Sequence, residues 1–240
     1  MNDSKIEDSD IEELARKGKY YGMPDYSIEA LVRQNNAPKF IHAVRRQKER
    51  WSLRNEKRFI LDYYEECSTF LLNTDVSDNI IAAKEMILST QLNGGKLIFA
   101  GNGASASIAN HASLDFTKQG KVRSVNFNES ALITAFSNDY GYDRWLGKAL
   151  EFYADQSDTL ILVSCSGTSL NVVNAAKYAN EQGINVITFT GHSNKNALKE
   201  AGDINFWIDS RAYNIIEGIH QIWLLSICDL IIGKKEYSVT

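Results

Sequence analysis

The amino-acid sequence predicts an α/β protein in which helices cover both faces of a parallel β-sheet. After residue 93, short apolar runs rich in β-branched and aromatic residues alternate with helical stretches, a pattern typical of βαβ crossovers. The 240 residues include only two prolines, which are few for a loop-rich all-β protein. Glycines follow two of the runs, where a strand would pass into a helix. We therefore expect a three-layer domain over residues 93–233, preceded by a helical N-terminal region.

The expected strands and helices can be placed in order. The strands are expected at 96–100, 122–127, 159–164, 185–190 and 204–208. The helices between and after them are expected at about 105–118, 129–136, 143–153, 169–181, 194–201 and 213–232. Each strand has only five or six residues, so this assignment depends on residue type and on the flanking turn residues.

The N-terminal region is predicted to be helical in most of its length. From about Pro38 the apolar residues fall near helical spacing as far as a break at 75–78, and a further helix is expected from Ser77 or Asp78 to Leu92. Residues 1–36 are assigned to an extension with one short helix at 27–34, and residues 37–240 to the domain. The extension has an acidic start and three tyrosines. It is interpreted either as a segment that wraps a neighbouring subunit or recruits a partner, or as a poorly ordered tail.

Composition excludes several classes of protein. A hydrophobic content of 44% and a net charge of −4 are not those of a disordered chain or of a protein steered to nucleic acid by charge. Cys67, Cys165 and Cys228 are widely spaced and form neither a disulfide framework nor a CxxC metal pair, which favours the cytoplasm. No signal peptide and no uninterrupted membrane span of about 20 apolar residues is expected.

The loop after the first expected strand, FAGNGASAS at 99–107, combines glycines with a hydroxyl. Gly101 and Gly103 allow a sharp turn and close approach of a ligand, and Ser105 is expected to cap the following helix, whose free N–H groups favour an anion. An ordinary capped turn is the alternative. The loop fits only a relaxed dinucleotide fingerprint, and residues 116–128 contain no acidic ribose ligand, so that interpretation is set aside.

The loop after the strand at 159–164, VSCSGTSLN at 163–171, predicts a phosphate site. Four hydroxyl groups surround Gly167 at the start of a helix, and an ordinary turn needs only one of them. Hydroxyls and exposed backbone N–H groups suit a phosphate without any Lys or Arg. Cys165 has no base partner that the sequence identifies, so a nucleophilic role is not assigned to it.

Four segments together resemble the SIS (sugar isomerase) phosphosugar-binding family, and within it the sedoheptulose-7-phosphate or phosphoheptose isomerases. They are GNGASASIANHASLD at 101–115, SNDYGYD at 137–143, SCSGTSLNVVNAAKYANEQGINVITFTG at 164–191 and IEGIH at 216–220. The resemblance covers about residues 40–235. It implies a flavodoxin-like five-stranded parallel sheet and a homotetramer with active sites at subunit interfaces.

The resemblance also implies which residues bind the substrate. Ser164, Cys165, Ser166 and Ser169 would surround the sugar phosphate, with Asn102, Gly103 and Ser105 lining the site and Asp139 bonding sugar hydroxyls. The family usually has threonine at the position of Cys165. Asn214 stands where the family has an aspartate.

The predicted acid–base and metal residues depart from the family pattern. His111 and Asp115 are spaced i,i+4 and should share a helix face, where the family carries a zinc-binding His and a Glu. Glu217 stands where the family has Gln, and Leu225 where it has a catalytic His. Aldose–ketose isomerisation needs a base, an acid and stabilisation of an enediolate, which zinc could supply. The resemblance therefore predicts Asp115 and Glu217 as a catalytic pair, and a three-ligand zinc site formed by His111, Asp115 and Glu217.

Two functions follow from this pattern. The first is a phosphosugar isomerase of the phosphoheptose type, with an altered substrate or metal-independent chemistry. The second is a non-catalytic SIS module that acts as a phosphosugar-binding regulator or as a protein-interaction module, which Leu225 and Asp115 would fit. His220 is expected to be bonded at a subunit contact. The basic run at 39–58 is interpreted as the solvated face of a long helix. Its aromatic residues are not interleaved at stacking spacing and the overall charge is negative, so no nucleic-acid partner is expected.

Overall fold

The computed structural model describes residues 8–33 and 37–237. The chain divides between Ser68 and Thr69 into two compact units. Of the helices, α3 (Ala37–Asn73) begins in the first unit and ends in the second. Each unit has its own buried apolar cluster.

The first unit is a small helical assembly. Helices α1 (Asp8–Tyr20) and α2 (Asp25–Arg33) pack together with the early part of α3. Ile28, Phe40 and Val44 are buried, and apolar side chains from α1, including Ile11 and Leu14, pack against them. The prediction of a poorly ordered tail is therefore wrong for residues 8–33. The acidic composition concealed an apolar stripe at helical spacing, which needs a partner helix to become buried.

The second unit contains the predicted five-stranded parallel sheet. The strands are β1 (Leu97–Gly101), β2 (Ser124–Asn126), β3 (Thr159–Ser164), β4 (Asn185–Thr190) and β5 (Ile204–Trp207). Their spatial order is β2-β1-β3-β4-β5, and every pair is parallel. This is the strand order of flavodoxin-like folds, so the predicted fold class is confirmed.

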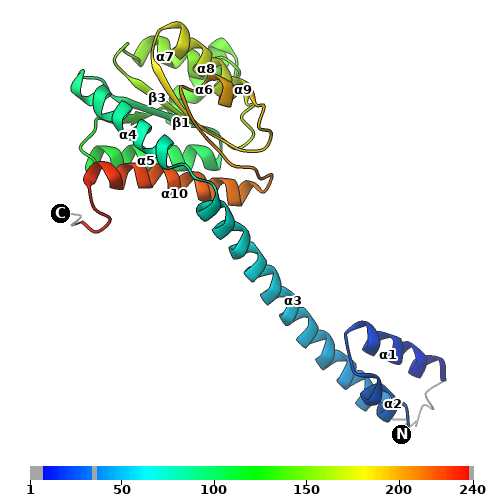
Figure 1. Ribbon diagram of the computed structural model, residues 1–240. Coiled ribbons are helices and arrows are strands. Elements are labelled where there is room, and N and C mark those ends of the chain that lie inside the picture. The colour runs from blue at the N-terminus through cyan, green and yellow to red at the C-terminus, as the bar shows by residue number, and fades with distance from the viewer. Residues whose placement is uncertain (1–7, 34–36, 238–240) are drawn as a thin grey trace. The chain divides into compact units, whose positions relative to one another are not determined.

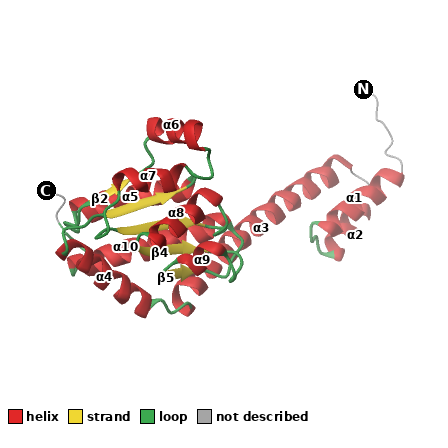
Figure 2. Cartoon of the chain, turned by 90° about the horizontal axis from the view of Figure 1, so that it is seen from above, coloured by secondary structure: helices red, strands yellow, loops and turns green. Residues whose placement is uncertain are grey.

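Helices form the two outer layers of this unit (Figure 1). One face carries α4 (Ser77–Leu92), α5 (Ala104–Lys118) and α10 (Tyr213–Ile232). The other carries α6 (Ser130–Tyr140), α7 (Trp145–Tyr153), α8 (Leu170–Glu181) and α9 (Ala197–Ala201). Helix α6 contributes no buried residue and stands out from the sheet (Figure 2).

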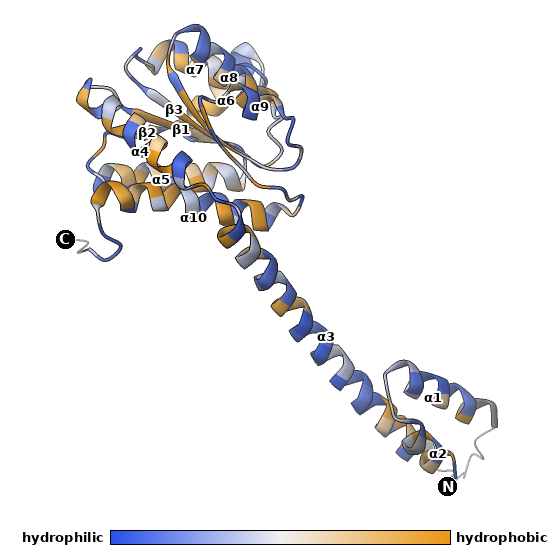
Figure 3. Cartoon of the chain, viewed as in Figure 1, coloured by the Kyte–Doolittle hydropathy of each residue, from blue (hydrophilic) through white to orange (hydrophobic). Residues whose placement is uncertain are grey.

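The core lies between the layers and is strongly apolar. Every residue of β1 and β3 is buried, as expected for strands covered on both faces. Trp145, Leu146 and Leu150 of α7 pack with the strands and with α8. Figure 3 shows the hydrophobic colouring concentrated along the strands and inner helix faces, whereas α3 is mostly hydrophilic.

Helix α10 is apolar because it is a core helix of this unit. Within the described part of the chain it alone is long and apolar enough to cross a membrane. Ile216, Leu224 and Ile227 are nevertheless buried, and the helix packs against α4 and α5. These contacts account for its composition without a membrane.

The helix predicted at 129–136 continues to Tyr140 in α6, and two other boundaries differ from the sequence prediction for local reasons. The predicted strand at 122–127 is reduced to three residues in β2, an edge strand that pairs only with β1. The predicted helix at 194–201 begins only at Ala197, because the Asn196 side chain accepts a hydrogen bond from the Lys199 N–H and caps it there. Helix α4 begins at Ser77 as predicted, and Asp75 accepts from the Ser77 N–H.

Candidate active site

The two loops singled out in the sequence lie side by side at the carboxyl ends of β1 and β3. These strands are neighbours in the sheet, with Gly101 paired in register with Val163. Helix α5 follows β1 and packs with α10 on one face, whereas α8 follows β3 on the other. The loops therefore flank the point where the chain changes faces, which is where open α/β sheets bind ligands.

Glycines shape the first loop. A Cβ atom at Gly101 would lie 2.8 Å from the carbonyl oxygen of Val163 and 2.8 Å from the backbone carbon of Ser105, so no larger residue fits there. Gly103 has a φ of +57° and precedes the first residue of α5. The prediction that Ser105 caps this helix is wrong. Ser105 lies inside the first turn and is buried, with its Oγ 3.8 Å from the Sγ of Cys165.

The second loop turns sharply at Gly167, whose φ is +63°. A Cβ atom there would collide with the side chain of Asn196, the residue that caps α9. Thr168 donates to the Ser166 Oγ from its N–H at 3.3 Å and from its hydroxyl at 3.1 Å. Ser169 stands at the N-cap of α8 without a side-chain cap hydrogen bond, so its hydroxyl is available to a ligand.

The loops and α10 enclose a cavity of about 160 Å³. Seven residues predicted as site residues line it: Asn102, Ser105, Ser164, Cys165, Ser166, Ser169 and Glu217. Tyr213, at the start of α10, completes the lining and was missed in the sequence. It lies four residues before Glu217 on the same helix, and this spacing is the signal that could have found it.

Glu217 is the one Asp, Glu or His among the cavity-lining residues, and it lies next to Cys165. The Cys165 thiol donates a hydrogen bond to the Glu217 Oε1 at 3.5 Å. Burial, together with the negative charge of Glu217, raises the pKa of the Cys165 thiol to about 12. Cys165 is therefore a protonated hydrogen-bond donor near neutral pH, which agrees with assigning it no nucleophilic role.

Amide side chains tie the two loops together at the rim of the cavity. Asn102 and Asn171 each donate to the other's Oδ1, both at 2.9 Å. The Tyr142 hydroxyl also donates to the Asn102 Oδ1, at 3.1 Å. Asn171 and Tyr142 were not predicted, although both fall inside the segments that carry the family resemblance.

Three predicted substrate-binding residues lie outside the cavity lining. Gly103 is exposed at the start of α5, and Asn214 is exposed next to Tyr213. Asp139 is exposed on α6, where it accepts a hydrogen bond from the Asn138 side chain at 2.9 Å. Within one chain, the structure does not bring these three to the cavity.

His111 and Asp115 share one face of α5, as the spacing predicted. The His111 Nε2 lies 3.2 Å from the Asp115 Oδ2, and the His111 Nδ1 lies 3.0 Å from the Gln221 side-chain nitrogen of α10. Both ring nitrogens of His111 therefore have partners, and neither His111 nor Asp115 lines the cavity that holds Glu217. In residues 8–33 and 37–237, no group of three His, Cys, Asp or Glu residues could hold a metal ion.

His220 is buried inside the fold, so a subunit contact does not account for its bonding. Its Nε2 donates to the Thr190 carbonyl at 3.0 Å, and burial lowers its pKa to about 4. This neutral imidazole anchors α10 to the end of β4, one turn after Glu217. Leu225, two turns after Glu217, is partly buried.

Comparison with known proteins agrees with this geometry. A SIS domain family model matches residues 62–191. The phosphoheptose isomerase of Aliarcobacter butzleri is 34% identical over 155 residues, which cover 62% of this chain and 82% of the relative. The probable phosphoheptose isomerase of Thermoplasma acidophilum is 35% identical over 179 residues, with coverages of 72% and 97%.

Solved structures show the same likeness. A phosphoheptose isomerase from Francisella tularensis superimposes with a TM-score of 0.68 at 27% identity, covering 74% of this chain and 98% of that one. One from Neisseria gonorrhoeae gives a TM-score of 0.67 at 26% identity, with the same coverages. The strand order, the two loops and these matches together show that the chain belongs to the SIS domain family.

Proposed function

We propose that this protein is a cytoplasmic ketose–aldose isomerase that acts on a phosphosugar resembling sedoheptulose 7-phosphate. The observation that carries the proposal is that the loop at 163–171 (the serine loop), the Asn102–Ser105 loop and Glu217 line one cavity. Phosphate-binding groups and a proton-transfer group thus lie within reach of one small ligand. The phosphoheptose isomerases to which the chain is similar supply the substrate class.

The serine loop is proposed to hold the phosphate. Ser164, Ser166 and Ser169 present hydroxyls to the cavity, and α8 begins directly after them. Free N–H groups in the first turn of a helix favour an anion, and hydroxyls add neutral donors. The cavity lining includes no Lys or Arg, so a phosphate there depends on these neutral donors.

Glu217 is proposed to move the proton. Isomerisation moves a proton from the hydroxyl-bearing carbon to the neighbouring carbonyl carbon through an enediolate, while the hydroxyl proton passes from the first oxygen to the second. A carboxylate at the cavity wall can carry out both transfers, and the protonated Cys165 thiol helps to fix its Oε1. Asp115, the second carboxylate of the predicted pair, lies outside this cavity, and its variant tests whether it reaches the substrate.

The predicted zinc ligands do not fit a metal site within one chain. His111 already pairs with Asp115 and Gln221, while Glu217 is engaged by Cys165 in the cavity. No step of the proposed reaction is therefore routed through zinc. Incubation with chelator and with added zinc tests whether the metal contributes.

The activity test is incubation of the purified protein with sedoheptulose 7-phosphate, with aldose formation followed by NMR. We expect product with chelator present. If no product forms in either condition, with chelator or with added zinc, the isomerase proposal is overturned. Binding of the sugar phosphate without turnover would support the non-catalytic regulator instead. Light scattering on the same sample tests the homotetramer that the family resemblance implies.

A binding variant tests the phosphate site independently of turnover. Ser166→Asp places a negative charge among the phosphate-binding hydroxyls and should abolish phosphosugar binding, measured by calorimetry. Ser130→Asp, an exposed serine in the first turn of α6, is the matched control and should bind normally. Equal affinity in the two variants would refute the site.

A further inference from the structure

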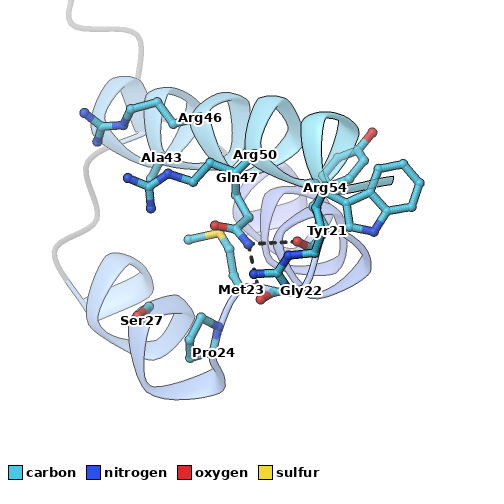
Figure 4. Close-up of a pocket in the computed structure, with 11 residues that line it drawn as sticks. Tyr21, Gly22, Met23, Pro24, Ser27, Ala43, Arg46, Gln47, Arg50 and Arg54 are labelled. Carbon is cyan, nitrogen blue, oxygen red and sulfur yellow. Dashed lines mark hydrogen bonds between the residues drawn. The ribbon is translucent and has the colours of Figure 1, made fainter. Parts of the chain in front are cut away.

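A second, larger hollow lies entirely within the first unit, on residues that the isomerase function does not use. Its volume is about 620 Å³, within the usual range of small-molecule sites. The turn after α1 and the start of α2 form one side, and α3 forms the other (Figure 4). The lining residues are Tyr21, Gly22, Met23, Pro24, Ser27, Ala43, Arg46, Gln47, Arg50, Trp51 and Arg54.

Three guanidinium groups give this hollow its charge. Arg46, Arg50 and Arg54 recur every four residues, so they project from one face of α3 at steps of about 6 Å along its axis. Neighbouring arginines of the same helix are ion-paired, Arg45 with Glu49 and Arg58 with Asp62. Among residues 8–33 and 37–237, none of the three lining arginines has an ion-pair partner, and no Asp or Glu lines the hollow.

The shape of the hollow is fixed by hydrogen bonds in which the three arginines take no part. The Gln47 side chain donates to the carbonyls of Tyr21 at 3.0 Å and Gly22 at 3.3 Å, so α3 holds the turn directly (Figure 4). Gly22 has a φ of +73°, and the Met23 N–H donates to the Gly18 carbonyl at 2.9 Å. The turn is thus built before any ligand arrives.

An aromatic cluster borders the same hollow. The Trp51 ring lies 5.9 Å from the Tyr21 ring and 6.0 Å from the Tyr20 ring, and Trp51 is 39% exposed. The basic run expected to be a plain solvated face therefore belongs to an aromatic cluster, in which Trp51 comes from α3 itself, Tyr20 ends α1 and Tyr21 follows it. The Lys48 ammonium lies 5.9 Å from the centre of the Tyr21 ring and adds a further positive charge. A partly exposed indole beside guanidinium groups without ion pairs suits a planar, anionic ligand.

We propose that this hollow binds a nucleoside polyphosphate, with the phosphates on the arginines and the base against Trp51 and Tyr21. Successive guanidinium groups can each bind one phosphate of a polyphosphate. The aromatic rings can stack against a nucleobase, which an inorganic polyphosphate does not have. An acidic peptide would satisfy the charges but would leave the ring faces without a stacking partner. This site is separate in residues and ligand from the phosphosugar cavity.

Calorimetry on the full-length protein tests the proposal with four probes: ATP, tripolyphosphate, adenosine and a single-stranded 12-mer oligonucleotide. We expect ATP to bind at least tenfold more tightly than tripolyphosphate and adenosine, and to weaken as salt rises. Equal affinity for ATP and tripolyphosphate would overturn the base contact. Tighter binding of the oligonucleotide would overturn the nucleotide in favour of nucleic acid.

Arginine variants locate the site. Arg46→Gln and Arg50→Gln should each weaken ATP binding about tenfold, because each removes a charge-assisted contact. Arg45→Gln and Arg58→Gln lie on the same helix outside the hollow and serve as matched controls, with unchanged affinity expected. Equal losses in all four variants would show only a general charge effect and would overturn the proposal.

Three further variants keep the result interpretable. Trp51→Phe retains a ring and should bind ATP within threefold of wild type, whereas Trp51→Leu should lose at least fivefold while circular dichroism stays unchanged. Ser166→Asp should leave ATP binding unchanged. A loss of ATP binding in Ser166→Asp would assign the nucleotide to the phosphosugar cavity and overturn the second site.

Discussion

The cavity at the carboxyl edge of the sheet and the exposed face of α5 each present a carboxylate, but with different surroundings. Glu217 lies among hydroxyls, an amide and a protonated thiol. Asp115 pairs with His111 on a surface that solvent reaches. The sequence pattern treats the two carboxylates as partners, whereas the structure gives only Glu217 a cavity. A motif residue is thus a catalytic candidate only once its surroundings are known.

The largest expected difference between the two regions is in turnover. Glu217→Gln should lower kcat by roughly 10²–10⁴-fold, because it removes the proposed proton carrier and keeps the side-chain shape. Asp115→Asn should lower kcat less than tenfold. Steady-state kinetics on both variants measures the contrast, and an equal loss in Asp115→Asn would show that Asp115 reaches the substrate.

The next effect concerns the pH dependence of stability. The helix that brings Glu217 to the cavity, α10, is anchored by the neutral side chain of His220. Its pKa is lowered to about 4 in the fold, against about 6.5 when unfolded. Below pH 6.5 the unfolded chain takes up a proton that the native state does not. This linkage should cost roughly 3 kcal/mol between pH 6.5 and 4 and nothing above pH 7. Urea unfolding from pH 7.5 to 4.5 measures it.

His220→Gln, which keeps a donor toward the Thr190 carbonyl, supplies the control for that measurement. The variant should be less stable at pH 7 but should lack this part of the acid dependence. If the free energy of unfolding changed with pH by the same amount in both proteins, the assignment to His220 would be contradicted.

A third contrast concerns the glycine of the serine loop. Gly167→Ala should destabilise the protein by about 2 to 3 kcal/mol, because a Cβ combines a strained φ with a collision against Asn196. Gly94→Ala has a similar φ of +76° and open space around it, so it should cost only about 1 kcal/mol. Thermal melts compare the two, and equal costs would mean that Asn196 yields.

The smallest expected effect is on the α5 face. His111→Ala should change the free energy of unfolding by less than about 1 kcal/mol, since its contact with Asp115 is partly exposed. Chemical denaturation at pH 6 measures this change. A much larger loss would mean that the pair is buried in the assembled protein, and would weaken its contrast with the cavity.

Much of the fold was predictable because it is encoded locally. The strand runs, the turn glycines and the i,i+4 pair of His111 and Asp115 depend on residues near one another in sequence. Tyr142 and Asn171 were missed because their contact with Asn102 joins segments 40 and 69 residues apart. Helix α1 was missed for a related reason, because its apolar residues become buried only by packing against Ile28 and Phe40 of other helices.

The distance between the two cavity loops depends on the pairing of two adjacent strands, β1 and β3. Gly101 and Val163 are register partners, so the spacing of the two loops is set by one interstrand distance of about 4.8 Å. The intervening chain holds α5, β2, α6 and α7, and of these α5 contributes Ser105 to the cavity. The segment from β2 to α7 can therefore be lengthened or exchanged to change what covers the cavity, while the spacing of the two loops stays the same.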